Sequence, residues 1–167
     1  MYKDVFSEAP YFEEYRDHWV EEHVWNFHIN EGCLFIALNK DNVVGFGGAI
    51  PVVKDKKIFD FLKTQHELPF VLDKTFYMSE LGVLSLFRKS DFHIGVELVK
   101  KRIQYAKQIG FTNYIMRTAK DDSNSKRLYL NILGAIELQG VVQNVEENPD
   151  EIASVSKQRI YLYGNIS

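Results

Sequence analysis

Glu80 is the carboxylate whose surroundings in the sequence are best suited to chemistry. It lies within the apolar run Phe76–Ser85, which is typical of a buried strand, and the basic residues Arg88 and Lys89 follow shortly after. A carboxylate held in an apolar strand is expected to have a raised pKa, which is suited to acid–base chemistry. The alternative is that Glu80 lies at the strand edge and pairs with a lysine.

The segment after this run has the character of an anion-binding loop. A strand that leads into a basic loop and then a helix presents unpaired N–H groups and the positive end of a helix dipole. Residues 88–127 carry 10 basic and 4 acidic side chains, which favours a pyrophosphate or nucleotide phosphate group. The alternative is that Ser90 or Asp91 merely caps a surface helix and that the lysines form a solvated face.

These residues carry a resemblance to a known family. The segment resembles the GNAT superfamily of acyl-CoA-dependent N-acetyltransferases, in which a strand ending in Leu-x-Val is followed by Arg/Gln-x-x-Gly-x-Gly/Ala. Leu81, Val83 and Arg88 stand at the family's intervals. Residues 127–135 look like the family's Leu-Tyr-x-x-x-Gly-Phe, and the resemblance extends from about Cys33 to Ala135.

The sequence departs from the family pattern in the loop and at the tyrosine. Counting from Arg88, a two-residue insertion places His93 and Gly95 at the family's two small positions, so only one of them is small. Tyr129 precedes Gly134 by five residues, where the family has four.

The resemblance implies that acetyl-CoA is the co-substrate and that no metal is needed. Acetyl-CoA would lie along Leu81–Ser85, with its pantetheine amides on backbone groups that no neighbouring strand fully uses. A backbone N–H near Val83 would polarise the thioester carbonyl as the amine attacks. The residues implied to bind acetyl-CoA are Leu81, Val83, Ser85, Arg88, Lys89, His93, Gly95 and Asn124.

The resemblance also implies a proton acceptor and a proton donor. An alkylammonium of pKa ~10 is almost wholly protonated at neutral pH, so a base must generate the neutral amine, and Glu80 is the candidate, directly or through water. Tyr129 is the candidate general acid for the CoA thiolate, because a phenol is a donor with a pKa slightly above that of a thiol. The alternative for Tyr129 is a core tyrosine.

The elements that position these residues are predicted from hydrophobic periodicity and turn signals. They describe an α/β fold of the α+β type: a GNAT-like mixed, mostly antiparallel central sheet with a central strand–helix–strand crossover and helices on both faces. The predicted strands are Tyr2–Phe6, Cys33–Asn39, Asn42–Val52, Phe76–Ser85, Asn113–Thr118, Gly140–Val145 and Arg159–Gly164. The predicted helices are one from Ser7 to Gly32, a short one within residues 54–74, one from Phe92 to Gly110, and Ser125–Leu133.

Length and composition predict one soluble, cytoplasmic domain, residues 1–167, with 46% hydrophobic residues. No apolar run reaches the ~18 residues of a membrane helix, and a net charge of −3 argues against a nucleic-acid partner. The single cysteine, Cys33, excludes an internal disulfide and a multi-cysteine metal site. His18, His23 and His28 spread around a helix without forming a metal-binding face, and we expect them at surface or boundary positions.

Charge is segregated along the chain. Residues 1–87 have a net charge of −6 and residues 88–127 a net charge of +6, which suits a cationic acceptor and a polyanionic co-substrate respectively. The sequence therefore predicts an N-acetyltransferase that moves an acetyl group from acetyl-CoA to a primary amine of a small molecule or peptide. A non-catalytic acyl-CoA-binding or sensor domain, transfer of a longer acyl group, and a homodimer all remain compatible with it.

Overall fold

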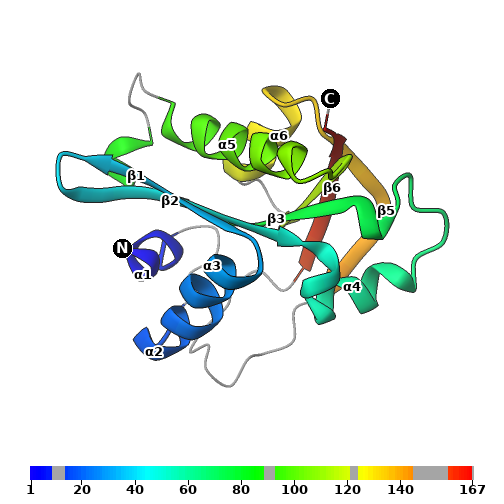
Figure 1. The fold of residues 1–167 in the computed structure, drawn as a ribbon, viewed down its shortest axis with the longest axis horizontal. Coiled ribbons are helices and arrows are strands. Elements are labelled where there is room, and N and C mark those ends of the chain that lie inside the picture. The colour runs from blue at the N-terminus through cyan, green and yellow to red at the C-terminus, as the bar shows by residue number, and fades with distance from the viewer. Residues whose placement is uncertain (9–13, 89–92, 121–123, 145–157, 167) are drawn as a thin grey trace.

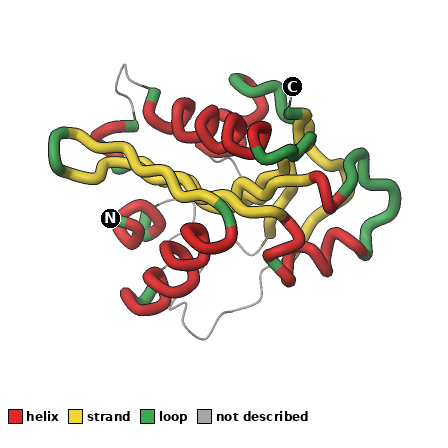
Figure 2. Tube along the Cα trace, in the orientation of Figure 1, coloured by secondary structure: helices red, strands yellow, loops and turns green. Residues whose placement is uncertain are grey.

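The fold is a six-stranded sheet between two layers of helices (Figures 1 and 2), seen in a computed structural model that describes residues 1–8, 14–88, 93–120, 124–144 and 158–166. The strand order is β1-β2-β3-β4-β6-β5. Strands β3 and β4 are parallel, and all other neighbours are antiparallel. The strands are β1 (Cys33–Asn39), β2 (Asn42–Pro51), β3 (Thr75–Val83), β4 (Asn113–Ala119), β5 (Ile136–Asn144) and β6 (Gln158–Asn165).

The helices divide between the two faces of the sheet. Figure 1 shows α5 and α6 above the sheet and α1 to α4 below it. The mixed, mostly antiparallel fold predicted from the sequence is confirmed. The helices are α1 (Tyr2–Phe6), α2 (Asp17–Val20), α3 (Phe27–Glu31), α4 (Lys56–Lys63), α5 (Ile94–Gln108) and α6 (Asn124–Asn131), with a π-helical turn η1 (Glu21–Asn26) joining α2 to α3.

The predicted first strand is wrong, because Tyr2–Phe6 forms helix α1. Tyr2, Val5 and Phe6 are spaced by three and four residues, which places all three on one helical face, and all three are buried. Ser7 ends this helix rather than beginning the next, since its N–H donates to the carbonyl of Lys3 at 2.9 Å.

The helix predicted from Ser7 to Gly32 corresponds to α2, η1 and α3 together. It begins later than predicted and ends where predicted. Arg16 is its N-cap, while residues 9–13 of the predicted helix lie outside the described residues. Gly32 ends it, and a Cβ at Gly32 would lie 2.1 Å from the carbonyl oxygen of Ala49. Only glycine lets the chain turn so close to β2.

The hairpin and the central crossover are confirmed. β1 and β2 pair across the turn at Lys40 and Asp41, and α5 connects the parallel strands β3 and β4. β3 is shorter than predicted, because Ser85 lies in a 3-10 turn, η4 (Ser85–Phe87), rather than in the strand. β5 begins at Ile136, four residues before the predicted start at Gly140.

The apolar core lies on both faces of the sheet. Val99 and Ala106 of α5 pack on Phe76 and Met78 of β3. On the opposite face, residues of α4 pack on β2 and β6 in a second cluster. Among the described helices, none combines the length and the apolar character that a membrane span needs.

Candidate active site

Strands β3 and β4 separate partway along their length, and this opening is the centre of the candidate site. They pair only between Thr75–Tyr77 and Asn113–Ile115, although β3 continues to Val83 and β4 to Ala119. Beyond the paired part, β3 and β4 share no ladder in the described residues. Main-chain groups along such an edge can bind an extended, amide-containing molecule as a strand would.

A β-bulge in β3 lies at the start of this opening. Gly48 of β2 pairs with Glu80, whereas Ile50 pairs with Tyr77, so β3 has one residue more than β2 across this interval. An extra residue bends a strand and redirects its side chains. The bulge therefore sets the direction in which the open part of β3 runs.

Arg102 of α5 is fully buried against this bulge. Its Nη1 donates to the carbonyl oxygens of Gly48 at 3.0 Å and Glu80 at 2.7 Å. Its Nε donates to the carbonyl of Leu98 at 3.2 Å, and its Nη2 donates to the Tyr129 hydroxyl at 3.1 Å. The guanidinium thus binds main-chain acceptors on both strands at the bulge and fixes their position.

Sequence reasoning missed Arg102, although a signal was present. Arg102 lies three residues after Val99 and four before Ala106, both of which are fully buried. It therefore shares the apolar face of α5. A charged residue within the buried stripe of an amphipathic helix is rare and marks a paired or functional group.

Glu80, the predicted general base, is partly buried, and its carboxylate lies on the face opposite Arg102. The Tyr2 hydroxyl of α1 donates to its Oε2 at 3.1 Å. A hydrogen bond donated to a carboxylate favours its charged form. The sequence did not indicate Tyr2, because the two residues are 78 positions apart.

Tyr129, the predicted general acid, is buried in α6 with 1% of its surface exposed. A guanidinium only donates, so the Tyr129 oxygen accepts from Arg102 and its own proton remains available to another acceptor. Burial raises the pKa of Tyr129, and the charge of Arg102 acts in the opposite direction. Arg102 joins Tyr129 to the main chain of Glu80, so the two predicted residues approach the same part of β3 from opposite faces.

The predicted phosphate-binding residues described here lie between the end of β3 and the first turn of α5. Arg88 donates from Nε to the carbonyl of Val83 at 2.8 Å, and its Nη1 lies 2.8 Å from Oε2 of Glu8. His93 is the N-cap of α5 with φ of 44°, in the left-handed region that favours glycine. Gly95 has room for a Cβ, which would meet nothing closer than 3.7 Å.

The remaining predicted residues are spread along the same edge. Leu81 packs against the core on the α5 face, and Ser85 is exposed in the 3-10 turn. Lys89 and the side chain of Asn124 lie outside what the structure describes.

His28 of α3 reaches the bulge from the opposite face and is 2% exposed, so the expected surface or boundary position is wrong for this histidine. Its Nδ1 lies 2.5 Å from the carbonyl oxygen of Val24, and its Nε2 lies 2.5 Å from Oγ of Ser79. Because a carbonyl only accepts, Nδ1 carries the proton in the neutral ring, and Nε2 accepts from Ser79. Burial lowers the pKa of His28 and favours this neutral form.

Arg117 of β4 is a second arginine at the opening, and the sequence prediction also missed it. It lies two residues beyond Ile115, the last residue of β4 that pairs with β3, and beside Tyr161 of β6. Its Nη1 donates to Oε1 of Gln143 at 3.1 Å, and the Tyr161 hydroxyl donates to the same oxygen at 2.6 Å. Burial raises the pKa of Tyr77, and the nearby charge of Arg117 acts in the opposite direction. By strand alternation Arg117 shares the face of Ile115, which packs with α4.

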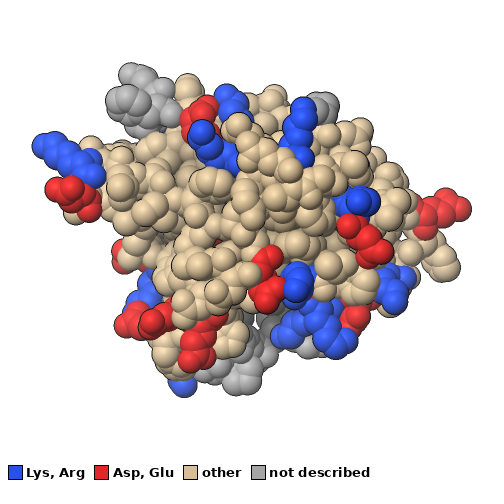
Figure 3. Space-filling view, viewed as in Figure 1, with Lys and Arg blue, Asp and Glu red and all other residues tan. Residues whose placement is uncertain are grey.

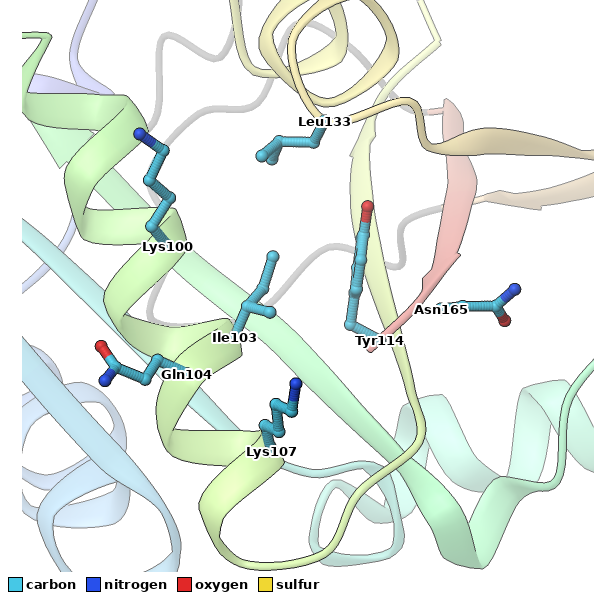
Figure 4. A pocket seen from close by; sticks show the side chains of 7 residues that line it. All are labelled: Lys100, Ile103, Gln104, Lys107, Tyr114, Leu133 and Asn165. Atoms are coloured by element: carbon cyan, nitrogen blue, oxygen red, sulfur yellow. The ribbon is translucent and has the colours of Figure 1, made fainter. Parts of the chain in front are cut away.

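A cavity of 360 Å³ lies away from this site, against the C-terminal half of α5 (Figure 4). It contains none of the predicted site residues, and its lysines are exposed. Its lining residues are Lys100, Ile103, Gln104, Lys107, Tyr114, Leu133 and Asn165.

The charges on the face drawn in Figure 3 follow the segregation in the sequence only in part. Acidic side chains gather at the lower left, over the N-terminal helices, and basic side chains lie along α5 at the top, but a further group of basic side chains lies at the lower right, near α4. In the part of the chain that the structure describes, no group of three or more histidine, cysteine or carboxylate side chains could hold a metal ion.

Comparison with known proteins relates most of the chain to one family. Residues 2–135 match the model of the acetyltransferase (GNAT) family. No match is found among curated proteins.

Solved structures share the fold at low sequence identity. A Bacillus subtilis acetyltransferase in complex with CoA is 15% identical, with a TM-score of 0.59 over 98% of this chain and 90% of that one. A GNAT-family acetyltransferase of Staphylococcus aureus is 18% identical, with a TM-score of 0.60 over 91% and 80%. A ribosomal-protein-alanine N-acetyltransferase of Brucella melitensis is 15% identical, with a TM-score of 0.56 over 89% and 75%.

Proposed function

The chain belongs to the acetyltransferase (GNAT) family, and from that premise we propose that it transfers an acetyl group from acetyl-CoA to a primary amine of a small molecule or peptide. The amine attacks directly in a ternary complex. The observation that carries the proposal is the opening between β3 and β4 beside the start of α5, with Glu80 on the open part of β3.

The open part of β3 and the start of α5 would hold the co-substrate. Acetyl-CoA, when bound, supplies an acetyl group activated as a thioester. Leu81 and Val83 offer main-chain groups to the pantetheine amides, and an N–H near Val83 stabilises the oxyanion. The residues assigned to the rest of acetyl-CoA are Ser85, Arg88, Lys89, His93, Gly95 and Asn124.

Glu80 and Tyr129 move the two protons of the reaction. Glu80 takes a proton from the amine as the C–N bond forms, directly or through water. Tyr129 gives its hydroxyl proton to the sulfur as the C–S bond breaks and its electron pair stays on sulfur. Tyr129 then regains a proton from water and Glu80 returns one, so the products are the N-acetylated amine and free CoA thiol.

The test combines binding with turnover. Calorimetric titration with CoA is expected to show one site, and mixing acetyl-CoA with a panel of primary amines is expected to release thiol. No CoA binding would overturn the proposal. Binding without thiol release above background would instead make the chain an acyl-CoA-binding sensor, and a series of acyl chain lengths would reveal a preference for a longer donor.

Glu80→Gln examines the proposed base, and the expected loss in kcat is about 10²- to 10⁴-fold. The matched control is Glu137→Gln, since Glu137 is also a partly buried strand glutamate, 3.4 Å from Nζ of Lys126 on α6. Unchanged kcat in Glu80→Gln would remove the role of Glu80 but leave the acetyl transfer itself standing.

A further inference from the structure

Glu80 and Arg117 flank the opening between β3 and β4 on the same face of the sheet. Glu80 lies three residues beyond Tyr77 on β3, and Arg117 lies two residues beyond Ile115 on β4, where Tyr77 and Ile115 form the last pair. The hydroxyl of Tyr2 on α1 bonds the carboxylate of Glu80, while Arg117 shares a face with residues that pack on α4. A carboxylate and a guanidinium therefore stand on opposite strands of one opening.

Neutral groups are the hydrogen-bond partners of Arg117. Gln143 accepts from its Nη1. Tyr77 and Tyr161 are close to Arg117 and carry no charge at neutral pH, because burial raises the pKa of Tyr77 to about 12 and also raises the pKa of Tyr161. In the described residues no ion pair within 4 Å includes Arg117, so its direct hydrogen-bond partner is a neutral group.

Two carboxylates lie within electrostatic range of Arg117, namely Glu80 and Asp55. Asp55 is occupied elsewhere, because its Oδ1 accepts from the N–H of Ile58 at 3.0 Å and caps α4. Glu80 is the group assigned to the amine. In the described residues neither carboxylate forms an ion pair with Arg117, so both act on the guanidinium only from a longer distance.

A guanidinium in this setting is suited to a carboxylate from outside the chain. Its planar fork presents parallel N–H donors that match the two oxygens of a carboxylate, and such charge-assisted pairs are stronger than neutral hydrogen bonds. The side-chain amide of Gln143 can turn away without moving any strand. An incoming carboxylate would thus replace a neutral acceptor with a charged one.

We propose that the acceptor is an amino carboxylate, with its amine at Glu80 and its carboxylate at Arg117. An α-amino acid is the simplest molecule of this class, because it carries both groups on one carbon. The inference rests on the proposed acetyl transfer and adds a specificity-determining residue to it. An anionic group on the substrate would be repelled by the acidic N-terminal region, but in this arrangement the substrate carboxylate contacts Arg117 and only the amine contacts Glu80.

The experiment uses pairs of acceptors that differ only in the carboxylate. Thiol release from acetyl-CoA is followed with phenylalanine against phenylalaninamide and 2-phenylethylamine, and with lysine against cadaverine, with kcat/KM corrected for the fraction of neutral amine. The carboxylate-bearing member is expected to be preferred by about ten- to a hundredfold, as expected for a lost charge-assisted hydrogen bond.

Arg117→Gln is expected to abolish this preference, and Arg117→Lys to keep part of it. A merely structural role would lower kcat/KM for both members of a pair equally. Lys107→Gln is the control, because Lys107 is an exposed cation on α5 on the other face. The calorimetric affinity for CoA and the midpoint of urea unfolding verify that each variant is folded.

The outcomes separate this inference from the function on which it rests. Thiol release without a preference for the carboxylate, or a preference that survives in Arg117→Gln, overturns the role of Arg117 and leaves the acetyl transfer intact. CoA binding without thiol release for any amine overturns the proposed function, and the inference falls with it. If Arg117→Gln does not fold, the wild-type ratios of kcat/KM within each pair of acceptors, compared with those of Arg117→Lys, still test the role of Arg117. Equal ratios in the two proteins would overturn it.

Discussion

The two faces of the sheet hold their polar groups at the opening in different ways. On the α5 face, Arg102 donates to the main-chain carbonyls of Gly48 and Glu80. On the opposite face, Arg117 donates to the side chain of Gln143, while His28 contacts the main-chain carbonyl of Val24 and the side chain of Ser79. The same residue type, arginine, therefore has mostly main-chain partners on one face, with the Tyr129 hydroxyl in addition, and a side-chain partner on the other.

This difference indicates that the two faces of the sheet have different roles. Main-chain acceptors cannot move without moving their strand, so Arg102 belongs to the framework that keeps the bulge in place. Side-chain acceptors can rotate, so the groups around Arg117 can give way to a ligand. The face of α1 to α4 is accordingly where an acceptor would be selected, and the α5 face is where the geometry is fixed.

The largest expected effect is on stability, in Arg102→Ala. We expect the free energy of unfolding to fall by roughly 3–5 kcal/mol, because two buried carbonyls and the Tyr129 hydroxyl lose their donor and a cavity forms. Arg117→Ala is expected to cost less than about 2 kcal/mol, because its partners can rearrange. Urea unfolding measures both free energies. Equal losses in the two variants would contradict the view that the α5 face is rigid and the opposite face adaptable.

Tyr129→Phe is expected to lower kcat by roughly 10²-fold while the affinity for CoA stays the same, because the variant removes the proton that is given to the leaving thiolate. The variant also removes the oxygen that accepts from Nη2 of Arg102, so the free energy of unfolding is expected to fall as well. The matched control is Tyr105→Phe, which removes a partly buried hydroxyl of α5 that donates to the carbonyl of Gly32 at 3.2 Å. Steady-state kinetics and calorimetry provide the two values. Unchanged turnover in Tyr129→Phe would leave Tyr129 as a core residue and make the α5 face purely structural.

Gly48→Ala is expected to destabilise the protein by about 1–3 kcal/mol, because a Cβ at Gly48 would lie 2.6 Å from Cδ2 of His28. Gly95→Ala is the control, since its Cβ would meet nothing closer than 3.7 Å, and helix propensity favours alanine there by up to ~1 kcal/mol. Thermal unfolding compares the two. A tolerated Gly48→Ala would mean that His28 is free to move and does not hold the bulge.

Much of the framework could be predicted from the sequence, because its signals are local. The hairpin of β1 and β2 has a short polar turn, and α5 has apolar residues at helical spacing ending near Gly110. Tyr2–Phe6 was mistaken for a strand because five residues carry too little periodicity, and a partner that is distant in sequence, Phe46, decides their conformation.

The site was predicted less completely, because its contacts join residues that are distant in the chain. Glu80 could be identified as a lone carboxylate in an apolar strand, but its donor Tyr2 could not. Arg102 stood within an apolar stripe, which was a usable signal. Arg117 could not be identified as a site residue, because it belongs to the site only by lying where β3 and β4 separate. No spacing in a single sequence indicates where the pairing of two parallel strands stops.

The smallest expected effect is a pH dependence of stability that comes from His28. Burial lowers the pKa of His28 below its ordinary value of 6.5, so below about pH 6.5 the unfolded chain binds a proton that the folded chain does not. Stability due to neutral His28 is therefore full above about pH 6.5 and declines as the pH falls toward the lowered pKa. Urea unfolding between pH 8 and pH 5 is expected to show this decline in the wild type and a shallower one in His28→Gln; parallel curves would contradict it.

The same measurement links the two faces, because the charge of Arg102 is one of the influences that lower the pKa of His28, while Asp55 acts in the opposite direction. In Arg102→Met the pKa of His28 should rise toward its ordinary value, and the decline with falling pH should become shallower than in the wild type. A decline that is unchanged in Arg102→Met would mean that Arg102 and His28, which contact the bulge from opposite faces of the sheet, act independently.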